Sequence, residues 1–275
     1  MKRALLYFEL LIVLVIVFLI HNHVIKGFQP TSRGIGVIII GAALGISSTI
    51  FQGYFKKVIA EPGIMGISTG ATLGAVIAIK SGAEFGSYQG IATSILFGLI
   101  SFYIFDFIKN RFLINGLILT LILSIPIVLL TLNEKHNPLF WTLGSFTELN
   151  KVHVKKFAPL VEIGIITSFF IARKIKVNSP RVKFFVALGA AFLIGPFTNV
   201  TGAVIGFGLF IPAITRKLIK GDTRRTLSYA ALVGPILLLL IDILISHLNN
   251  VSASVIAISI AAVLPRSGKE QPQSE

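Results

Sequence analysis

Cysteine is absent from this chain of 275 residues, which excludes disulfide bonds and thiolate metal sites. Charged residues are scarce at 13%, whereas they make up about a quarter of an ordinary soluble domain. Hydrophobic residues account for 54% of the chain, and its mean hydropathy is +0.87. The composition therefore excludes an ordinary soluble domain and predicts an integral membrane protein.

Motifs for catalysis are also missing. No segment matches the phosphate-binding loop G-x-x-x-x-G-K-[ST], so we expect this chain to hydrolyse no nucleotide itself. The five histidines lack H-x-x-x-H or H-E-x-x-H spacing. His21 and His23 lie close together near the end of an apolar run, where a solvated interfacial position is favoured over a metal pair. We expect no enzyme activity, and no metal or cofactor in this chain.

Acidic residues are few, with 11 against 25 Lys and Arg, and the formal net charge is +14. The basic residues form short clusters between apolar runs, whereas nucleic-acid binders gather them on one face. We therefore expect membrane lipids as partners and no nucleic acid. If the amino terminus is cytoplasmic and the spans alternate, 18 of the 25 basic residues face the cytoplasm. This asymmetry follows the positive-inside rule.

Apolar runs cover nearly the whole chain, and about 20 apolar residues cross a bilayer as a helix. The expected fold class is all-α: a polytopic transmembrane bundle forming one domain over residues 1–275, with residues 1–3 cytoplasmic and 266–275 a polar tail. The first run is too long for a signal-peptide core. Nine spans and a weaker tenth are predicted, at residues 4–20, 34–51, 64–79, 91–108, 113–132, 157–172, 182–201, 202–218, 229–248 and, for the weak one, 251–264.

Small residues recur at helical spacing between residues 41 and 75, and in lipid they let helix backbones approach closely. Glu61, Pro62 and Gly63 predict a tight turn between two apolar runs. Glycines and Pro212 within residues 202–218 predict a bent or broken helix, whose freed backbone groups need neighbouring partners.

Polar residues inside the predicted spans are candidates for a translocation path. Gln52 is the best of them because it is costly to bury. Ser47 and Ser48 more commonly bond back to their own helix, so packing is favoured for both. Asn115 and Thr120 are weaker candidates.

Acidic residues inside spans mark a function or an internal partner. Asp106 lies close to Lys109, so a local ion pair is expected. Asp242 is the most central of these acids and is also a path candidate. We favour a structural hydrogen bond between helices for it over a proton relay, since a relay needs a chain of partners. Outside the spans, Phe140 and Trp141 are expected to anchor an outer loop at the membrane interface.

Two segments resemble a known family. GAALGISSTIFQ at residues 41–52 and AEPGIMGISTGA at residues 60–71 closely resemble the permease subunit of ABC importers for iron-siderophore complexes, haem and cobalamin. GAVIGFGLFIPAITRKLIKGDTRR, at residues 202–225, is similar to a second segment of that family. The resemblance covers about residues 33–246.

The resemblance implies a large-fold (type II) importer permease in the bacterial cytoplasmic membrane. It implies a pore shared with a second permease copy or paralogue, ATPase subunits on the cytoplasmic side, and an extracytoplasmic binding protein. Arg33 becomes a candidate contact for the binding protein, and a residue snorkelling at a helix start explains it equally well. The resemblance also gives candidates for the ATPase side, namely Lys174, Lys176, Arg181, Arg216, Asp222 and Arg224.

Two other functions stay open. A secondary transporter or channel would use Asp242 and Glu162 as ion or proton sites. A non-transporting membrane scaffold is suggested by the connection at residues 173–181, which is shorter than the family's coupling loop.

Overall fold

The computed structural model describes residues 2–25, 30–133, 138–175, 179–219 and 223–247, and in these ranges it is helical and contains no strand. The all-α prediction is confirmed. The predicted tenth span, 251–264, lies outside the described residues. The helices are α1 Lys2–Val24, α2 Pro30–Phe55, α3 Ile67–Lys80, α4 Tyr88–Ile108, the 3-10 turn η1 Lys109–Arg111, α5 Phe112–Thr131, α6 Pro138–Leu143, α7 Lys151–Ile171, α8 Pro180–Thr201, α9 Phe207–Leu218 and α10 Thr223–His247.

Local sequence signals set several of these helix starts. The Ser87 side chain accepts a hydrogen bond from the Gly90 amide and caps α4. Asn150 caps α7 in the same way, and Ser179 caps α8, whose first residue is a proline. Five helical segments are long and apolar enough to cross a membrane, at residues 5–24, 30–55, 88–131, 180–201 and 223–246.

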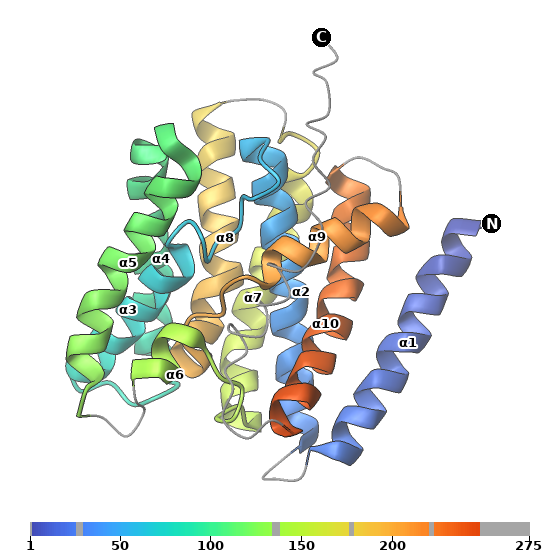
Figure 1. Ribbon diagram of the computed structural model, residues 1–275, viewed down its shortest axis with the longest axis horizontal. Coiled ribbons are helices and arrows are strands. Elements are labelled where there is room, and N and C mark those ends of the chain that lie inside the picture. Colours follow the sequence, from blue (N-terminus) through green and yellow to red (C-terminus); the bar gives the residue numbers. More distant parts are fainter. Residues whose placement is uncertain (1, 26–29, 134–137, 176–178, 220–222, 248–275) are drawn as a thin grey trace.

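Helix α2 forms the centre of the bundle (Figure 1), with its most extensive contact against α10 and further contacts with α7, α8 and α9. Its packing depends on glycine. A Cβ atom on Gly41 would lie 2.7 Å from the backbone of Gly234 in α10, and one on Gly45 would meet the Ala230 carbonyl. The predicted role of small residues in close helix packing is confirmed at these two positions.

Helices α1 and α5 lie at opposite edges of the bundle (Figure 1). Both expose many large apolar side chains, such as Phe8 and Leu19 in α1 and Leu121 and Leu129 in α5. Such faces suit contact with lipid tails or with another apolar helix. Successive long helices run in opposite directions, so the end of α2, the α4–α5 turn, the end of α7 and the start of α10 gather at one end of the bundle (Figure 1).

Two of the helices are half-length. Helix α3 has 14 residues and α9 has 12, so at 1.5 Å per residue they extend about 21 Å and 18 Å, less than the roughly 30 Å of a hydrocarbon core. Non-helical segments, residues 56–66 and 202–206, precede them. The predicted break after α8 is confirmed, and it occurs at Gly202 and Gly206, which adopt positive φ angles of 69° and 93°.

Two polar predictions have different outcomes. The expected ion pair between Asp106 and Lys109 is confirmed, with Nζ and Oδ1 2.6 Å apart, and Lys183 of α8 pairs with the other carboxylate oxygen. The predicted membrane-interface anchoring by Trp141 is wrong, because its side chain is only 3% exposed and packs against Phe85 and Phe140. A local aromatic pattern marks both anchors and core residues, and only the tertiary packing separates them.

Candidate functional site

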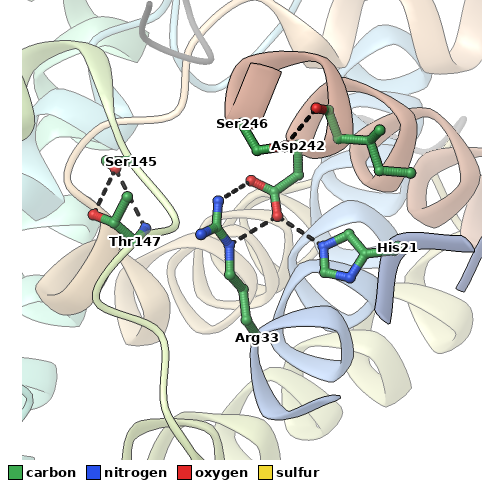
Figure 2. Close-up of polar contacts among 7 residues, drawn as sticks. His21, Arg33, Ser145, Thr147, Asp242 and Ser246 are labelled. Atoms are coloured by element: carbon green, nitrogen blue, oxygen red, sulfur yellow. Dashed lines mark hydrogen bonds and ion pairs between the residues drawn. The ribbon is translucent and has the colours of Figure 1, made fainter. Parts of the chain in front are cut away.

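Asp242 in α10 lies at the centre of a buried polar cluster (Figure 2). Its Oδ2 atom is 2.8 Å from Nε2 of His21 and 2.9 Å from Nε of Arg33. The second carboxylate oxygen accepts a hydrogen bond of 2.5 Å from Nη2 of Arg33. The side chains of Asp242 and His21 are almost fully buried and that of Arg33 is 14% exposed. The Arg33 contact is therefore bidentate, a geometry that carboxylates and guanidinium groups favour.

This cluster joins three helices, since His21 belongs to α1, Arg33 to α2 and Asp242 to α10. The predicted hydrogen bond between helices at Asp242 is confirmed, and the preference for a structural role over a proton relay stays a prediction. The solvated position expected for His21 is wrong, because its ring is fully buried against Asp242. Asp242 also lies near the end of α10, beside the first turn of α2, and not midway along the bundle as its sequence position indicated. Docking of a binding protein at Arg33 stays a prediction.

Gln52 and Arg216, predicted for different roles, meet in the structure. Nη2 of Arg216 in α9 donates a hydrogen bond of 2.6 Å to Oε1 of Gln52 in α2. Gln52 is 7% exposed, and its Nε2 atom has no hydrogen-bond partner among the described residues. The pair links the central helix to the half-helix α9. Gln52 therefore presents an unused donor beside the half-helix α9, which suits a residue that lines a path.

The two serines of α2 behave differently. Ser47 donates its hydroxyl hydrogen bond to the Leu44 carbonyl of its own helix, at 3.1 Å, so the predicted back-bonding is confirmed for Ser47. Ser48 is fully buried and its hydroxyl has no partner among the described residues. It lies against Gly208 in the first turn of α9. Ser48 thus faces the start of a half-helix.

Residues 62–66 form a turn that leads into α3. The Pro62 carbonyl accepts hydrogen bonds from the amides of Ile67 and Ser68. Glu61, immediately before the turn, is fully buried, and its carboxyl oxygens accept hydrogen bonds from the amides of Ile64 and Gly206. Gly63 is tightly packed, because a Cβ atom there would lie 2.9 Å from Cγ2 of Ile205 and 3.0 Å from both carboxyl oxygens.

The remaining candidates lie at or near one end of the bundle. Asn115 donates a hydrogen bond to the Ile108 carbonyl and so closes the α4–α5 turn. Lys176 and Asp222 lie outside the described residues. The other ATPase-side candidates are exposed, namely Lys174, Arg181, Arg216 and Arg224. Within the described ranges, no group of three or more His, Asp or Glu side chains is placed to hold a metal ion.

His153 in α7 belongs to a separate cluster, packed edge-on against Phe85 with ring centroids 5.5 Å apart. Its Nδ1 atom is 2.9 Å from the Glu148 carbonyl oxygen. Burial lowers the pKa of His153 below its ordinary value of 6.5, although the Glu148 carbonyl acts in the opposite direction. The folded protein therefore resists protonation of His153 more than the unfolded chain does.

We expect acidification through about pH 6.5 to reduce the free energy of unfolding, because the unfolded chain then takes up a proton that the folded His153 resists. His153→Gln should flatten this part of the pH profile of the thermal midpoint. His23→Gln is the control, since His23 is exposed. Equal slopes for the wild-type protein and His153→Gln would show that His153 is not the cause.

The comparison with known families gives a long match, because the model described as the FecCD transport family matches residues 21–264. The chain belongs to the FecCD transport family. The matched range includes every candidate residue named above. The family resemblance predicted from residues 41–71 and 202–225 is therefore confirmed.

Relatives of this FecCD chain are named as permeases. It is 26% identical over 252 residues to the iron-uptake system permease protein FeuB of Bacillus subtilis, covering 83% of this chain and 75% of FeuB. It is 25% identical over 235 residues to the vitamin B12 import system permease protein BtuC of Yersinia enterocolitica, covering 77% and 70%. Together with its apolar helices, this similarity makes the FecCD chain a multi-pass membrane protein.

Solved structures agree on the fold. A metal-chelate type ABC transporter in an inward-facing conformation matches with a TM-score of 0.78 at 23% identity, over 94% of this chain and 96% of that one. PsaBC from Streptococcus pneumoniae, solved in complex with Fab, matches with a TM-score of 0.60 at 18% identity, over 90% and 92%. At these identities the comparison shows the permease fold alone.

Proposed function

We propose that this chain is the membrane-spanning permease subunit of an ATP-driven importer. Its cargo would be an iron-siderophore complex, haem or a related iron or cobalamin chelate, carried across the cytoplasmic membrane. The observation that carries the proposal is the family match over residues 21–264. The names of FeuB and BtuC, an iron-uptake permease and a vitamin B12 import permease, support this class of cargo.

The energy would come from partner subunits, because the sequence contains no phosphate-binding loop. ATPase subunits would bind the end of the bundle that exposes Lys174, Arg181 and Arg224. That end would be cytoplasmic, as would the amino terminus, since Lys and Arg accumulate on cytoplasmic loops. A second permease would complete the pore, and an extracytoplasmic binding protein would deliver the chelate.

Within this chain, Gln52 and Ser48 are the best-supported residues of the translocation path. Both are buried in α2, both have polar atoms with no partner among the described residues, and both face α9. Asp242 has a different role in this proposal. Its contacts with Arg33 and His21 join three helices, so we assign it a structural role.

Uptake into vesicles tests the proposed function. The chain is co-expressed with an ATPase subunit and a binding protein of a FecCD-family importer, and the complex is reconstituted. We expect uptake of a labelled ferric siderophore, haem or cobalamin that requires ATP and persists when the proton gradient is collapsed. Uptake that needs the gradient and not ATP would instead establish a secondary transporter. Failure to retain any ATPase subunit in mild detergent would support a non-transporting scaffold.

A further inference from the structure

Glu61 is a fully buried acid in the segment that joins α2 to α3. Its two carboxyl oxygens serve different parts of the chain. Oε2 accepts a hydrogen bond of 2.9 Å from the Ile64 amide within the same segment. Oε1 accepts one of 3.2 Å from the amide of Gly206, which is 145 residues away. A buried carboxyl group needs such partners, since burial without them is costly.

The Gly206 amide belongs to the start of α9. Gly206 is the N-cap of this helix and has no side chain that could cap it. The first amides of a helix lack partners within the helix, and the dipoles of the peptide groups favour an acidic group there. Glu61 therefore supplies from another segment the cap that α9 does not supply itself.

The same acid adjoins the start of α3. The turn that follows Glu61 leads directly into this helix, with the Ile67 amide bonded to the Pro62 carbonyl at 2.9 Å. A third element, α5, also contacts the turn. The Thr120 hydroxyl of α5 lies 3.1 Å from the Gly63 carbonyl oxygen and 3.0 Å from that of Gly116 in its own helix. Glu61 is thus the side chain that bridges the starts of the two half-helices.

Space around Glu61 is filled. A Cβ atom on Gly208, in the first turn of α9, would overlap the Glu61 side chain and the Ser48 hydroxyl. Gly208 therefore lets α9 approach the acid closely, and Ser48 of α2 lies in the same contact. Glu61 and Ser48 both lie directly against Gly208. A shift of α9 must therefore either carry the Glu61 segment along or break the Gly206 hydrogen bond.

We propose that Glu61 is a positioning residue of the translocation path, which fastens the start of α3 to the start of α9 so that the two half-helices move as one body when the path opens and closes. This inference rests on the proposed function for the meaning of opening and closing. The link itself exists in the chain whether or not the chain transports a chelate.

Spin labels test the link directly, because the chain has no cysteine. Val58→Cys places a label on the α2–α3 segment and Leu218→Cys places one at the end of α9, at side chains that are 69% and 46% exposed. The distance between the labels is measured in lipid nanodiscs, in the assembled transporter, without nucleotide and after trapping with ATP and vanadate. We expect one narrow distance distribution that is the same in both states. A distance that changes between the states would overturn the proposal.

Glu61→Gln tests whether Glu61 is the cause. Glutamine keeps the volume, but its NH2 group replaces one acceptor oxygen and faces an N–H donor, so one of the two hydrogen bonds is lost. We expect the share of molecules in which the two starts are not linked to rise roughly fivefold to tenfold, the factor that corresponds to one hydrogen bond. This change should broaden the distance distribution and lower the uptake per ATP hydrolysed. A merely structural role would lower the yield of folded protein without changing this ratio.

Two further variants make the outcome decisive. Glu61→Asp keeps both oxygens but is one methylene too short to reach both amides, so it should broaden the distribution as Glu61→Gln does. Glu84→Gln alters an exposed acid in the α3–α4 loop and should change nothing. Unchanged distributions in both Glu61 variants would overturn the proposal. If wild-type vesicles show no ATP-driven uptake, the proposed function fails, and the nucleotide-free distance distributions still test the link that Glu61 makes between the two half-helices.

Discussion

Replacing Asp242 with alanine is expected to lower the free energy of unfolding by about 3–5 kcal/mol, the usual effect of removing one partner from a buried ion pair. The substitution leaves the Arg33 guanidinium without its bidentate partner and removes the acid that His21 contacts. An ordinary hydrogen bond between membrane helices is worth only about 0.6 kcal/mol. The charge left without a partner therefore dominates the loss. Unfolding in mixed detergent micelles with increasing SDS measures it.

A double-mutant cycle separates this pair from general damage. Arg33→Ala should cost at least as much as Asp242→Ala, because the carboxylate it leaves behind is more deeply buried than the guanidinium. The double variant should be more stable than the sum of the two losses predicts, by about 0.5–3 kcal/mol. Glu162→Ala is the control, since Glu162 is an exposed acid on α7. A loss at Asp242 no larger than at Glu162 would show that the cluster contributes nothing.

The sequence predicted the contacts that form within one segment. The Asp106–Lys109 pair and the Ser47 bond to Leu44 connect residues three apart, and helical periodicity alone brings such residues together. The glycine pattern around Gly41 was equally readable, because small residues on one helical face have a direct meaning in lipid. These predictions needed no knowledge of which helices are neighbours.

Contacts between distant segments could not be predicted in this way. Asp242 lies 221 residues from His21 and 209 from Arg33, so nothing near Asp242 in the sequence identified its partners. A usable signal did exist, since an acid inside a span requires a partner, and His21 and Arg33 stand directly beside the ends of the predicted spans 4–20 and 34–51. Glu61 was predicted only as part of a turn. Its second partner is the backbone amide of Gly206, and because nearly every residue has such an amide, the sequence does not identify this one as a partner.

Replacing Gly41 with alanine is expected to lower the free energy of unfolding by about 1–3 kcal/mol, or more, through overpacking. The new methyl group would lie 2.7 Å from the backbone carbon and oxygen of Gly234 and from Cα of Pro235. All three neighbouring atoms belong to the backbone, so no side-chain rotation relieves the overlap. Helix α2 would have to move away from α10, its most extensive contact. Unfolding in mixed micelles measures the loss.

Gly98→Ala provides a matched control with the opposite sign. Gly98 is also a buried glycine inside a helix, but a Cβ atom there would lie 3.5 Å from the nearest atom, the Ala71 methyl, which is ordinary contact. Alanine is favoured over glycine inside a helix by about 0.5–1 kcal/mol, so Gly98→Ala should be neutral or stabilising. If both substitutions destabilise equally, the loss at Gly41 is a general effect of adding a methyl group to a buried glycine, and the α2–α10 contact does not explain it. A loss confined to Gly41 would instead locate the constraint in the backbone of α10, where Gly234 and Pro235 leave α2 no alternative position.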